Sequence, residues 1–358
     1  MDLRDDWHLS QPLDSAYALP AGLYVDEAVA KQERRLVFAR SWQLVAHAAQ
    51  LSSPGDHVAD EISGVPVILV RGEDGKLRGF HNVCRHRAGP IALCNGRGAR
   101  SLRCRYHGWN YGLDGYLRNA PDMDSASQFD LKAVHLPEIQ VEQWRGLVFA
   151  ALDCVTPLAE IVAGIDERMN GHDPETYRFH HRVSYEIDCN WKVYVDNYLE
   201  GYHVPHIHPT LNRLLDYRSY TTEVAPWYSL QWSPLENIEN VYGAGDALYY
   251  FIWPNVMLNL LPGRLQTNRV IPLGHARCRV DFDYFYPASA EGDTSERFDR
   301  DQAFSDVVQQ EDVEICISVQ KRLGSGSYTA GRLCPRRESG VHHFHELVRR
   351  AFREAGVS

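Results

Sequence analysis

The segment that decides the fold of this chain lies between residues 84 and 107. It contains Cys84-Arg85-His86, an interval of 17 residues, and then Cys104-Arg105-Tyr106-His107. Thiolates and imidazoles are ligands that proteins use to hold transition metals. Because the two short pairs combine both ligand types, we expect Cys84, His86, Cys104 and His107 to bind one metal centre.

Two kinds of centre use two cysteines and two histidines. In a Rieske [2Fe-2S] cluster, two thiolates hold one iron and two imidazoles hold the other, which raises the reduction potential. A structural zinc ion is the alternative, but Cys-x-His followed by Cys-x-x-His differs from the usual zinc-finger spacing. The spacing therefore favours an electron-transfer cluster. Cys94 lies between the two pairs and is an alternative, additional ligand.

The residues that follow the second pair are His107-Gly108-Trp109-Asn110-Tyr111-Gly112-Leu113-Asp114-Gly115. Asp-Gly between extended segments predicts a hairpin turn. The stretch resembles the H-G-W-x-Y-x-x-D-G block of Rieske non-heme iron oxygenases, and the similarity extends from about Trp42 to Phe352. The resemblance implies the α subunit, or terminal oxygenase component, of such an enzyme. It also implies a [2Fe-2S] Rieske cluster, a mononuclear Fe(II) ion and O2 as co-substrate.

Length and composition exclude several classes of protein. A chain of 358 residues is long enough for about two domains. Its net charge of -10 lacks the basic footprint of a nucleic-acid binder. No apolar run approaches the roughly 18 residues of a membrane span, and the N-terminus has no signal-peptide pattern. We expect a cytoplasmic protein that binds neither nucleic acid nor membrane.

The pattern along the chain predicts an α+β fold. Residues 42–155 contain short β-rich runs separated by turns, which indicates an antiparallel β domain around the cluster. Residues 156–358 alternate strand-like and helical runs, which indicates helices packed on an antiparallel sheet in the catalytic domain. Residues 1–41 are expected to be a helical segment that packs on this second domain, and 288–297 a surface loop.

A second group of metal ligands lies between Asn197 and His208, with histidines at positions 203, 206 and 208. Two imidazoles and a carboxylate that leave open positions are the ligand set of non-heme Fe(II) oxygenases. On a continuous helix, His206 would lie near the face of His203, and His208 would point roughly 140° away. Because Pro205 disfavours an unbroken helix, spacing alone leaves both histidines open.

The family resemblance selects among these histidines. Its pattern, acid-x-x-His-x-x-x-x-His, matches Glu200, His203 and His208, so His203 and His208 are the implied iron ligands. Glu200 is the implied bridge that contacts a mononuclear-site histidine and a cluster histidine of the neighbouring subunit. Most members have Asp there, and Glu is shared with relatives that oxidise quaternary amines. Asn197 resembles the family's amide near the iron.

The third iron ligand is expected in the segment Gln310–Cys316. Glu311 and Asp312 lie near the edge of a helical apolar stripe formed by Phe304, Val307, Val308, Ile315 and Val319. Periodicity does not distinguish between the two acids as the ligand. The resemblance to the family's E-D-x-x-x-C block implies Asp312. The histidines at 342, 343 and 345 are a second candidate cluster, but we expect them to pack in a helical tail.

The resemblance also implies the partners. Electrons from NAD(P)H reach such enzymes through a separate reductase, in some cases by way of a ferredoxin, and this chain has no dinucleotide-binding fingerprint. Arg85 and Arg105, beside the cluster cysteines, are expected to donate to sulfur or to face the reductase. Similar enzymes form homotrimers in which the cluster of one subunit lies beside the iron of the next.

The substrate is the least specified feature. The segment from Asn190 to His203 resembles the short homotrimeric oxygenases of choline, carnitine, glycine betaine and stachydrine, which implies monooxygenation, N-demethylation or C–N cleavage of a small quaternary ammonium compound or methylated amine. Aromatic faces can bind such a cation, and the same side chains can instead fill the core. The candidates for either role are Trp227, Tyr228, Trp232, Tyr242, Tyr249, Tyr250, Phe251 and Trp253. Hydroxylation of an aromatic ring is the alternative, and a Rieske electron carrier without oxygenase activity is a remote one.

Overall fold

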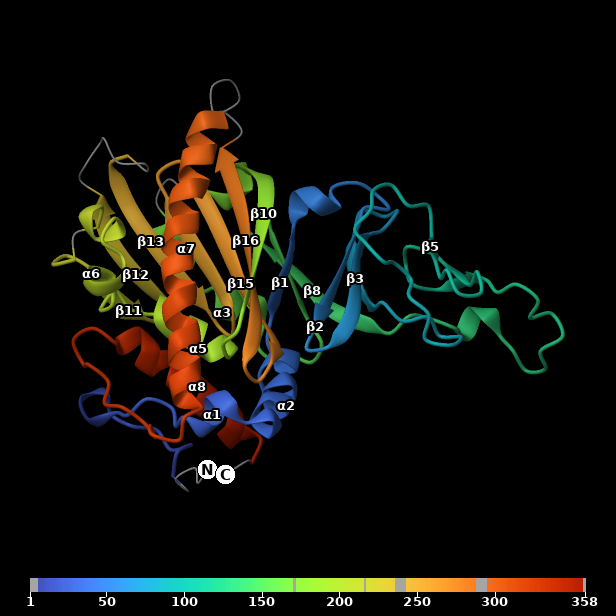
Figure 1. Cartoon of the computed structure of the whole chain (residues 1–358). Helices are drawn as coiled ribbons and strands as arrows, with labels where there is room; N and C mark the ends of the chain where they lie inside the picture. Colours follow the sequence, from blue (N-terminus) through green and yellow to red (C-terminus); the bar gives the residue numbers. More distant parts are fainter. Residues whose placement is uncertain (1–5, 170–171, 216, 236–242, 288–294, 357–358) are drawn as a thin grey trace. The chain divides into compact units, whose positions relative to one another are not determined.

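The structure, a computed structural model, describes residues 6–169, 172–215, 217–235, 243–287 and 295–356. The chain divides into two compact units (Figure 1). One unit is residues 38–158, and the other combines residues 1–37 with 159–358. The boundaries expected from the sequence were 41/42 and 155/156. Of the loop expected at 288–297, residues 288–294 lie outside the described residues and residues 295–297 belong to a helix.

The smaller unit is built from antiparallel strands, as its sequence pattern predicted. Its six-stranded sheet has the order β1-β9-β8-β4-β3-β2. These strands are β1 Gln43–His47, β2 His57–Ile62, β3 Val65–Arg71, β4 Leu77–His81, β8 Glu138–Trp144 and β9 Leu147–Ala151. A three-stranded sheet contains β5 Leu102–Arg103, β6 Asn110–Tyr111 and β7 Leu117–Asn119.

The core of this unit extends to the cysteines of the first motif. Cys84, Cys104, Trp109 and Tyr111 are buried in the same apolar cluster as residues of β3 and β4. The Asp-Gly pair after the motif forms the turn between β6 and β7, and Gly115 has φ +84°, a conformation that glycine adopts without strain. The motif therefore stands on a packed core.

The larger unit contains a seven-stranded antiparallel sheet in the order β10-β16-β15-β14-β13-β12-β11. The strands are β10 Tyr177–Ile187, β11 Thr221–Val224, β12 Tyr228–Leu235, β13 Gly245–Ile252, β14 Val256–Leu261, β15 Arg264–Gly274 and β16 Arg277–Pro287. Strands β14 and β16 lie on either side of β15 in this sheet. The sheet with its helices confirms the predicted α+β class.

Helices pack on this sheet, and the long helix α7 crosses it (Figure 1). The helices of the chain are α1 Gly22–Val25, α2 Glu27–Leu36, α3 Leu158–Ile161, α4 Ile165–Arg168, α5 Trp191–Tyr198, α6 Val204–Ile207, α7 Ser295–Leu323 and α8 Ser339–Glu354. In the described ranges, none of them combines the length and the apolar composition that a bilayer span requires. The stripe predicted on α7 is incompletely buried, since Val307 is 52% exposed and Val319 is 38% exposed.

Helix α5 is fixed at its first turn by a buried ion pair with α2. Lys192 is fully buried and its Nζ lies 2.5 Å from Glu33 Oε1. The indole N–H of Trp191 donates to Glu33 Oε2 at 2.9 Å. The side chain of Asn190 caps the helix by accepting from the N–H of Lys192, and also accepts from its Nζ. The N-terminal segment is therefore part of the support of α5.

Removal of Glu33 should destabilise the protein, because it takes away the carboxylate that is paired with the buried ammonium of Lys192. We expect Glu33→Ala to cost about 3–5 kcal/mol and to lower the Tm measured by circular dichroism. The matched control is Glu27→Ala on the same helix, where the pair with Lys31 is exposed and the Tm should not change. A double variant, Glu33→Leu with Lys192→Met, should recover most of the loss, and an unchanged Tm in Glu33→Ala would contradict this role.

Candidate metal centres

The two Cys/His pairs of the smaller unit lie in turns with the same backbone pattern. In each turn the cysteine N–H donates to the carbonyl five residues later, which belongs to Gly89 in the first and to Trp109 in the second. The cysteine carbonyl accepts from the residue four positions later, Ala88 or Gly108. Both of these residues have positive φ, +55° and +75°. Equivalent turns therefore present the two cysteines in equivalent ways.

Aromatic side chains of the motif hold the candidate cluster ligands. The ring of His86 stacks on Trp109 with centroids 4.8 Å apart, and its centroid lies 4.6 Å from that of His107. Tyr111 places its hydroxyl 3.2 Å from Cys84 Sγ and accepts a hydrogen bond from the N–H of Arg85. Burial raises the pKa of Tyr111, so the hydroxyl keeps its proton and can donate to a thiolate.

The arrangement of these four ligands fits a two-iron cluster better than a single ion. The cysteines are buried and the histidine rings lie together nearer the surface. A [2Fe-2S] Rieske cluster separates its two thiolates from its two imidazoles in this way, whereas all four would bind the same ion in a tetrahedral zinc site. His86 Nδ1 is buried and has no hydrogen-bond partner, which suits an imidazole nitrogen reserved for a metal. Cys94 is exposed.

The second candidate centre depends on a break in helix α5. The helix ends at Tyr198, a turn follows, and α6 begins at Val204. The carboxylate of Glu200 accepts from the backbone N–H groups of Tyr202 and His203 and holds this turn. Helix α6 then ends at Ile207, and His208 has φ -116° and ψ 75°, outside the helical region. His208 can therefore turn back toward His203.

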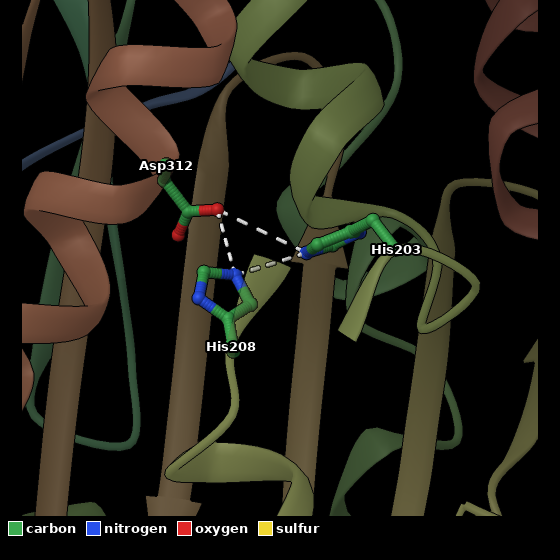
Figure 2. A group of neighbouring side chains, drawn as sticks. All are labelled: His203, His208 and Asp312. Atoms are coloured by element: carbon green, nitrogen blue, oxygen red, sulfur yellow. Dashed lines mark hydrogen bonds and ion pairs between the residues drawn. The ribbon is translucent and has the colours of Figure 1, made fainter. Parts of the chain in front are cut away.

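Three donor atoms converge at this point (Figure 2). His203 Nε2 and His208 Nε2 are 3.2 Å apart, and Asp312 Oδ1 is 3.0 Å from His208 Nε2. The distance from Asp312 Oδ1 to His203 Nε2 is 3.8 Å. Asp312 comes from α7, whereas both histidines come from the segment after α5. Ligands at right angles, about 2.1 Å from one ion, would be roughly 3 Å apart, so this triad fits a 2-His-1-carboxylate iron site.

Each donor has a further polar contact that orients it. His203 Nδ1 lies 2.7 Å from Glu200 Oε1, and His208 Nδ1 lies 2.7 Å from Glu311 Oε2. An imidazole that uses Nε2 for a metal carries its proton on Nδ1 and donates it to such a carboxylate. Asn197 Nδ2 donates to Asp312 Oδ1 at 2.5 Å. Without metal, burial lowers the pKa of His208, but Asp312 and Glu311 outweigh burial and raise it.

The histidines left over from the sequence analysis lie elsewhere. His206 is exposed and away from the triad. In α8, His342 contacts the carbonyl of Gln11, whereas His345 contacts Asp196. His343 is half-buried, and its burial together with the nearby His342 lowers its pKa to about 4. These three histidines contact different parts of the unit, in agreement with the expected packing role.

A cavity of about 120 Å³ opens onto the triad. Part of its lining is one row of cross-strand neighbours, Gln231 on β12, Tyr249 on β13, Asn259 on β14 and Gln266 on β15. Their side chains share a face of the sheet because each is paired directly with the next. Sequence reasoning missed three of these four residues, since they come from separate strands and share only their register.

The aromatic residues named from the sequence have different locations. Tyr249 lines the cavity, whereas Phe251 and Trp253 are buried against Phe344 of α8. Trp227 lies under the guanidinium of Arg350. Tyr242 lies outside the described residues. The aromatic residues that do line the cavity are Tyr194, Tyr198, Tyr220, Tyr249, Phe282 and Phe304.

Comparisons with known proteins agree with both candidate centres. Residues 41–137 match the family model of the Rieske [2Fe-2S] domain. Residues 174–354 match that of the ring-hydroxylating α subunit, catalytic domain. A cluster domain followed by such a catalytic domain defines a Rieske non-heme iron oxygenase. This chain belongs to that family and is an oxidoreductase whose cofactors are a Rieske [2Fe-2S] cluster and a mononuclear iron.

Relatives cover nearly the whole chain. The chloroplastic choline monooxygenase of Arabidopsis thaliana is 36% identical over 354 residues, covering 94% of this chain and 83% of the relative. The carnitine monooxygenase oxygenase subunit of Escherichia coli K12 is 30% identical, and the alignment covers 95% of this chain and 95% of the relative. The crystal structure of the quaternary ammonium Rieske monooxygenase CntA with L-carnitine superposes on this chain with a TM-score of 0.87 at 27% sequence identity. The superposition covers 98% of this chain and 99% of that chain.

The assignment of His208 rather than His206 as an iron ligand can be tested by metal content. We expect His208→Ala to lose the mononuclear iron and retain the cluster, giving about two iron atoms and two sulfides per chain. His206→Ala is the matched control and should retain about three iron atoms, because its side chain is exposed. Loss of iron in His206→Ala, with all iron retained in His208→Ala, would reverse the assignment.

Proposed function

We propose that this chain is the oxygenase component of a monooxygenase for a small quaternary ammonium compound or methylated amine. The observation that carries the proposal is the aromatic cavity beside the triad. In the overall reaction, substrate C–H, O2, two electrons and two protons give C–OH and water. Where the new hydroxyl lies on a carbon bonded to nitrogen, the C–N bond of the carbinolamine breaks to an amine and an aldehyde, with loss of a proton.

The lining of the cavity favours a cation. Four tyrosines and two phenylalanines contribute to it, and aromatic faces attract quaternary ammonium groups. Arg264 also lines the cavity, and its guanidinium forms an ion pair with Asp301. Both side chains are buried, so their charges offset each other. Besides the triad carboxylate of Asp312, Glu200 adds a carboxylate to the lining. Two kinds of similar protein, the choline and carnitine monooxygenases, act on quaternary ammonium compounds, which supports the same substrate class here.

The site residues have distinct proposed roles. Cys84, His86, Cys104 and His107 hold the cluster, and His203, His208 and Asp312 hold the iron. The bound metals supply electron storage and the activation of O2. Asn197 fixes the carboxylate of Asp312 by its hydrogen bond, while Glu200 and Glu311 orient the two imidazoles. The protein thereby sets the positions at which the cofactors work.

Glu200 is the proposed route for electrons from the cluster of a neighbouring subunit. Besides its contact with His203, it lines a second cavity of about 550 Å³, together with the carboxylates of Asp196 and Glu338. Burial raises the pKa of Glu338, and the nearby Glu200 and Asp196 raise it further. This cavity also contains one guanidinium, Arg322, among its described lining residues.

The turns of the cluster have the opposite charge. Arg85, Arg87, Arg103 and Arg105 are exposed there, in a chain whose net charge is -10. A basic rim around the cluster complements the carboxylates of the second cavity, as a head-to-tail contact between copies requires. We infer a homotrimer, and inter-subunit electron transfer has been described for the quaternary ammonium Rieske monooxygenase CntA. A separate NAD(P)H-dependent reductase, in some systems with a ferredoxin, would deliver electrons in the cytoplasm.

Oxygen consumption with a surrogate reductase tests the substrate class. We expect choline, carnitine or a related betaine to stimulate O2 uptake with one product formed per O2, because the cation binds the aromatic wall. Benzoate and other aromatic acids are the matched comparison and should not be oxidised. Formaldehyde would indicate N-demethylation, whereas trimethylamine with a larger aldehyde would indicate cleavage of the C–N bond to the longer substituent. Coupled turnover of aromatic acids alone would contradict the proposal.

The role of Glu200 is tested by Glu200→Ala. We expect both metal centres to remain bound, and the mass in solution to stay near that of three chains, while coupled turnover falls on the order of 10- to 100-fold. Iron and sulfide analysis, light scattering and O2 uptake measure these quantities. Glu314→Ala, an exposed acid on α7, is the control and should keep full activity. Normal turnover of Glu200→Ala would exclude Glu200 from electron transfer.

A further inference from the structure

The polar groups of the cavity beside the triad are mostly bonded to one another. Gln231 donates to the carbonyl of Tyr198 and accepts from the hydroxyl of Tyr220. Asn259 accepts from the hydroxyl of Tyr198 and donates to Gln266. These amides therefore have partners without any ligand, and they form a satisfied part of the cavity wall.

Two buried amides of the same cavity differ from this pattern. Gln309 is 2% exposed, and its Nε2 has no hydrogen-bond partner. Asn268, also 2% exposed, has an Oδ1 without a partner. A buried polar atom without a partner is costly, and protein interiors rarely retain one without a reason. Both side chains line the cavity, so a ligand in it can supply the missing partners.

The orientation of Gln309 follows from its neighbour. Tyr194, buried on α5, donates its hydroxyl proton to Gln309 Oε1 at 2.7 Å. Burial raises the pKa of Tyr194, so the hydroxyl keeps the proton that it donates. The amide oxygen is thus occupied, and the Nε2 donor remains for the cavity. Gln309 also lies three residues before Asp312, so it is on the same side of α7 as the proposed iron ligand.

We propose that Gln309, together with Asn268, binds a hydroxyl group of the substrate. A hydroxyl both accepts and donates, and it matches one unpaired donor and one unpaired acceptor. A carboxylate only accepts, and the guanidinium that would attract it is already bonded to Asp301. The inference rests on the proposed function, since it assigns the second polar group of a quaternary ammonium substrate. The substrate is then a hydroxyalkyl ammonium compound of net charge +1.

Binding of two matched ligands tests the proposal without turnover. Choline and n-propyltrimethylammonium differ in a hydroxyl that replaces a methyl group, and both are titrated calorimetrically into the anaerobic metal-loaded protein with an oxidised cluster. We expect choline to bind at least about tenfold more tightly, because the hydroxyl fills otherwise unpaired hydrogen bonds. Gln309→Leu should abolish that preference while leaving the affinity for n-propyltrimethylammonium and the iron content nearly unchanged.

Two further variants control for general damage. Gln310→Leu makes the same substitution at the adjacent position, where the side chain is exposed and bonded to Glu314, and it should keep the full preference. Tyr194→Phe removes the hydroxyl that orients Gln309 and should reduce the preference even if Gln309→Leu fails to fold. In Tyr194→Phe the affinity for n-propyltrimethylammonium should stay near the wild-type value.

The outcomes separate this inference from the proposed function. Equal binding of the two ligands to the wild-type protein would overturn the hydroxyl site while the ammonium class stands. Tighter binding of glycine betaine than of choline, lost in Gln309→Leu, would assign the site to a carboxylate and also overturn it. Binding of neither ammonium compound would overturn the substrate class and this inference together.

Discussion

The break between helices α5 and α6 is the constraint on which the geometry of the catalytic site depends. Within this break, the carboxylate of Glu200 accepts from two backbone N–H groups and also contacts His203 Nδ1. If the helix continued unbroken through this segment, His203 and His208 would point roughly 140° apart. The turn held by Glu200, followed by the early end of α6, brings their Nε2 atoms within 3.2 Å. One acid therefore shapes the backbone and orients a proposed ligand.

The rest of the larger unit keeps this arrangement in place. Helix α5 is fixed at its start by the buried Glu33–Lys192 pair, and helix α7 brings Asp312 from elsewhere in the sequence. The face of the sheet then supplies a row of polar and aromatic side chains in register. Because these parts are buried and hydrogen-bonded, the triad is held by the packing of the whole unit. Such preorganisation suits a site in which ligand distances must be maintained.

The sequence predicted the features that are local in the chain. The cluster motif is contiguous apart from one loop, and the strand at 256–261 has the bounds that its apolar run indicates. Spacing could not choose between His206 and His208, because the answer depends on where α6 ends. Periodicity could not separate Glu311 from Asp312, since both side chains reach His208, at Nδ1 and at Nε2. Only the three-dimensional structure distinguishes these two contacts.

The cavity was the least predictable part for a related reason. Of the aromatic residues named from the sequence as candidate cation binders, Tyr249 is the one described residue that lines the cavity beside the triad. Its neighbours there, Gln231 and Asn259, are set by strand register, which a single sequence specifies weakly. The position of Gln309, one helical turn before Asp312 on α7, was a sequence signal that it could lie near the iron site. Its unpaired amide, however, is visible only with Tyr194 in place.

The central claim is that a cluster and a separate iron work in series, and a single-turnover experiment tests it most directly. Protein with both centres reduced is mixed rapidly with O2 and a quaternary ammonium substrate, and the cluster absorbance is followed. The wild-type protein should reoxidise its cluster as product forms, whereas His208→Ala should keep its cluster reduced and form no product. Cluster reoxidation at the same rate in both proteins would contradict the account.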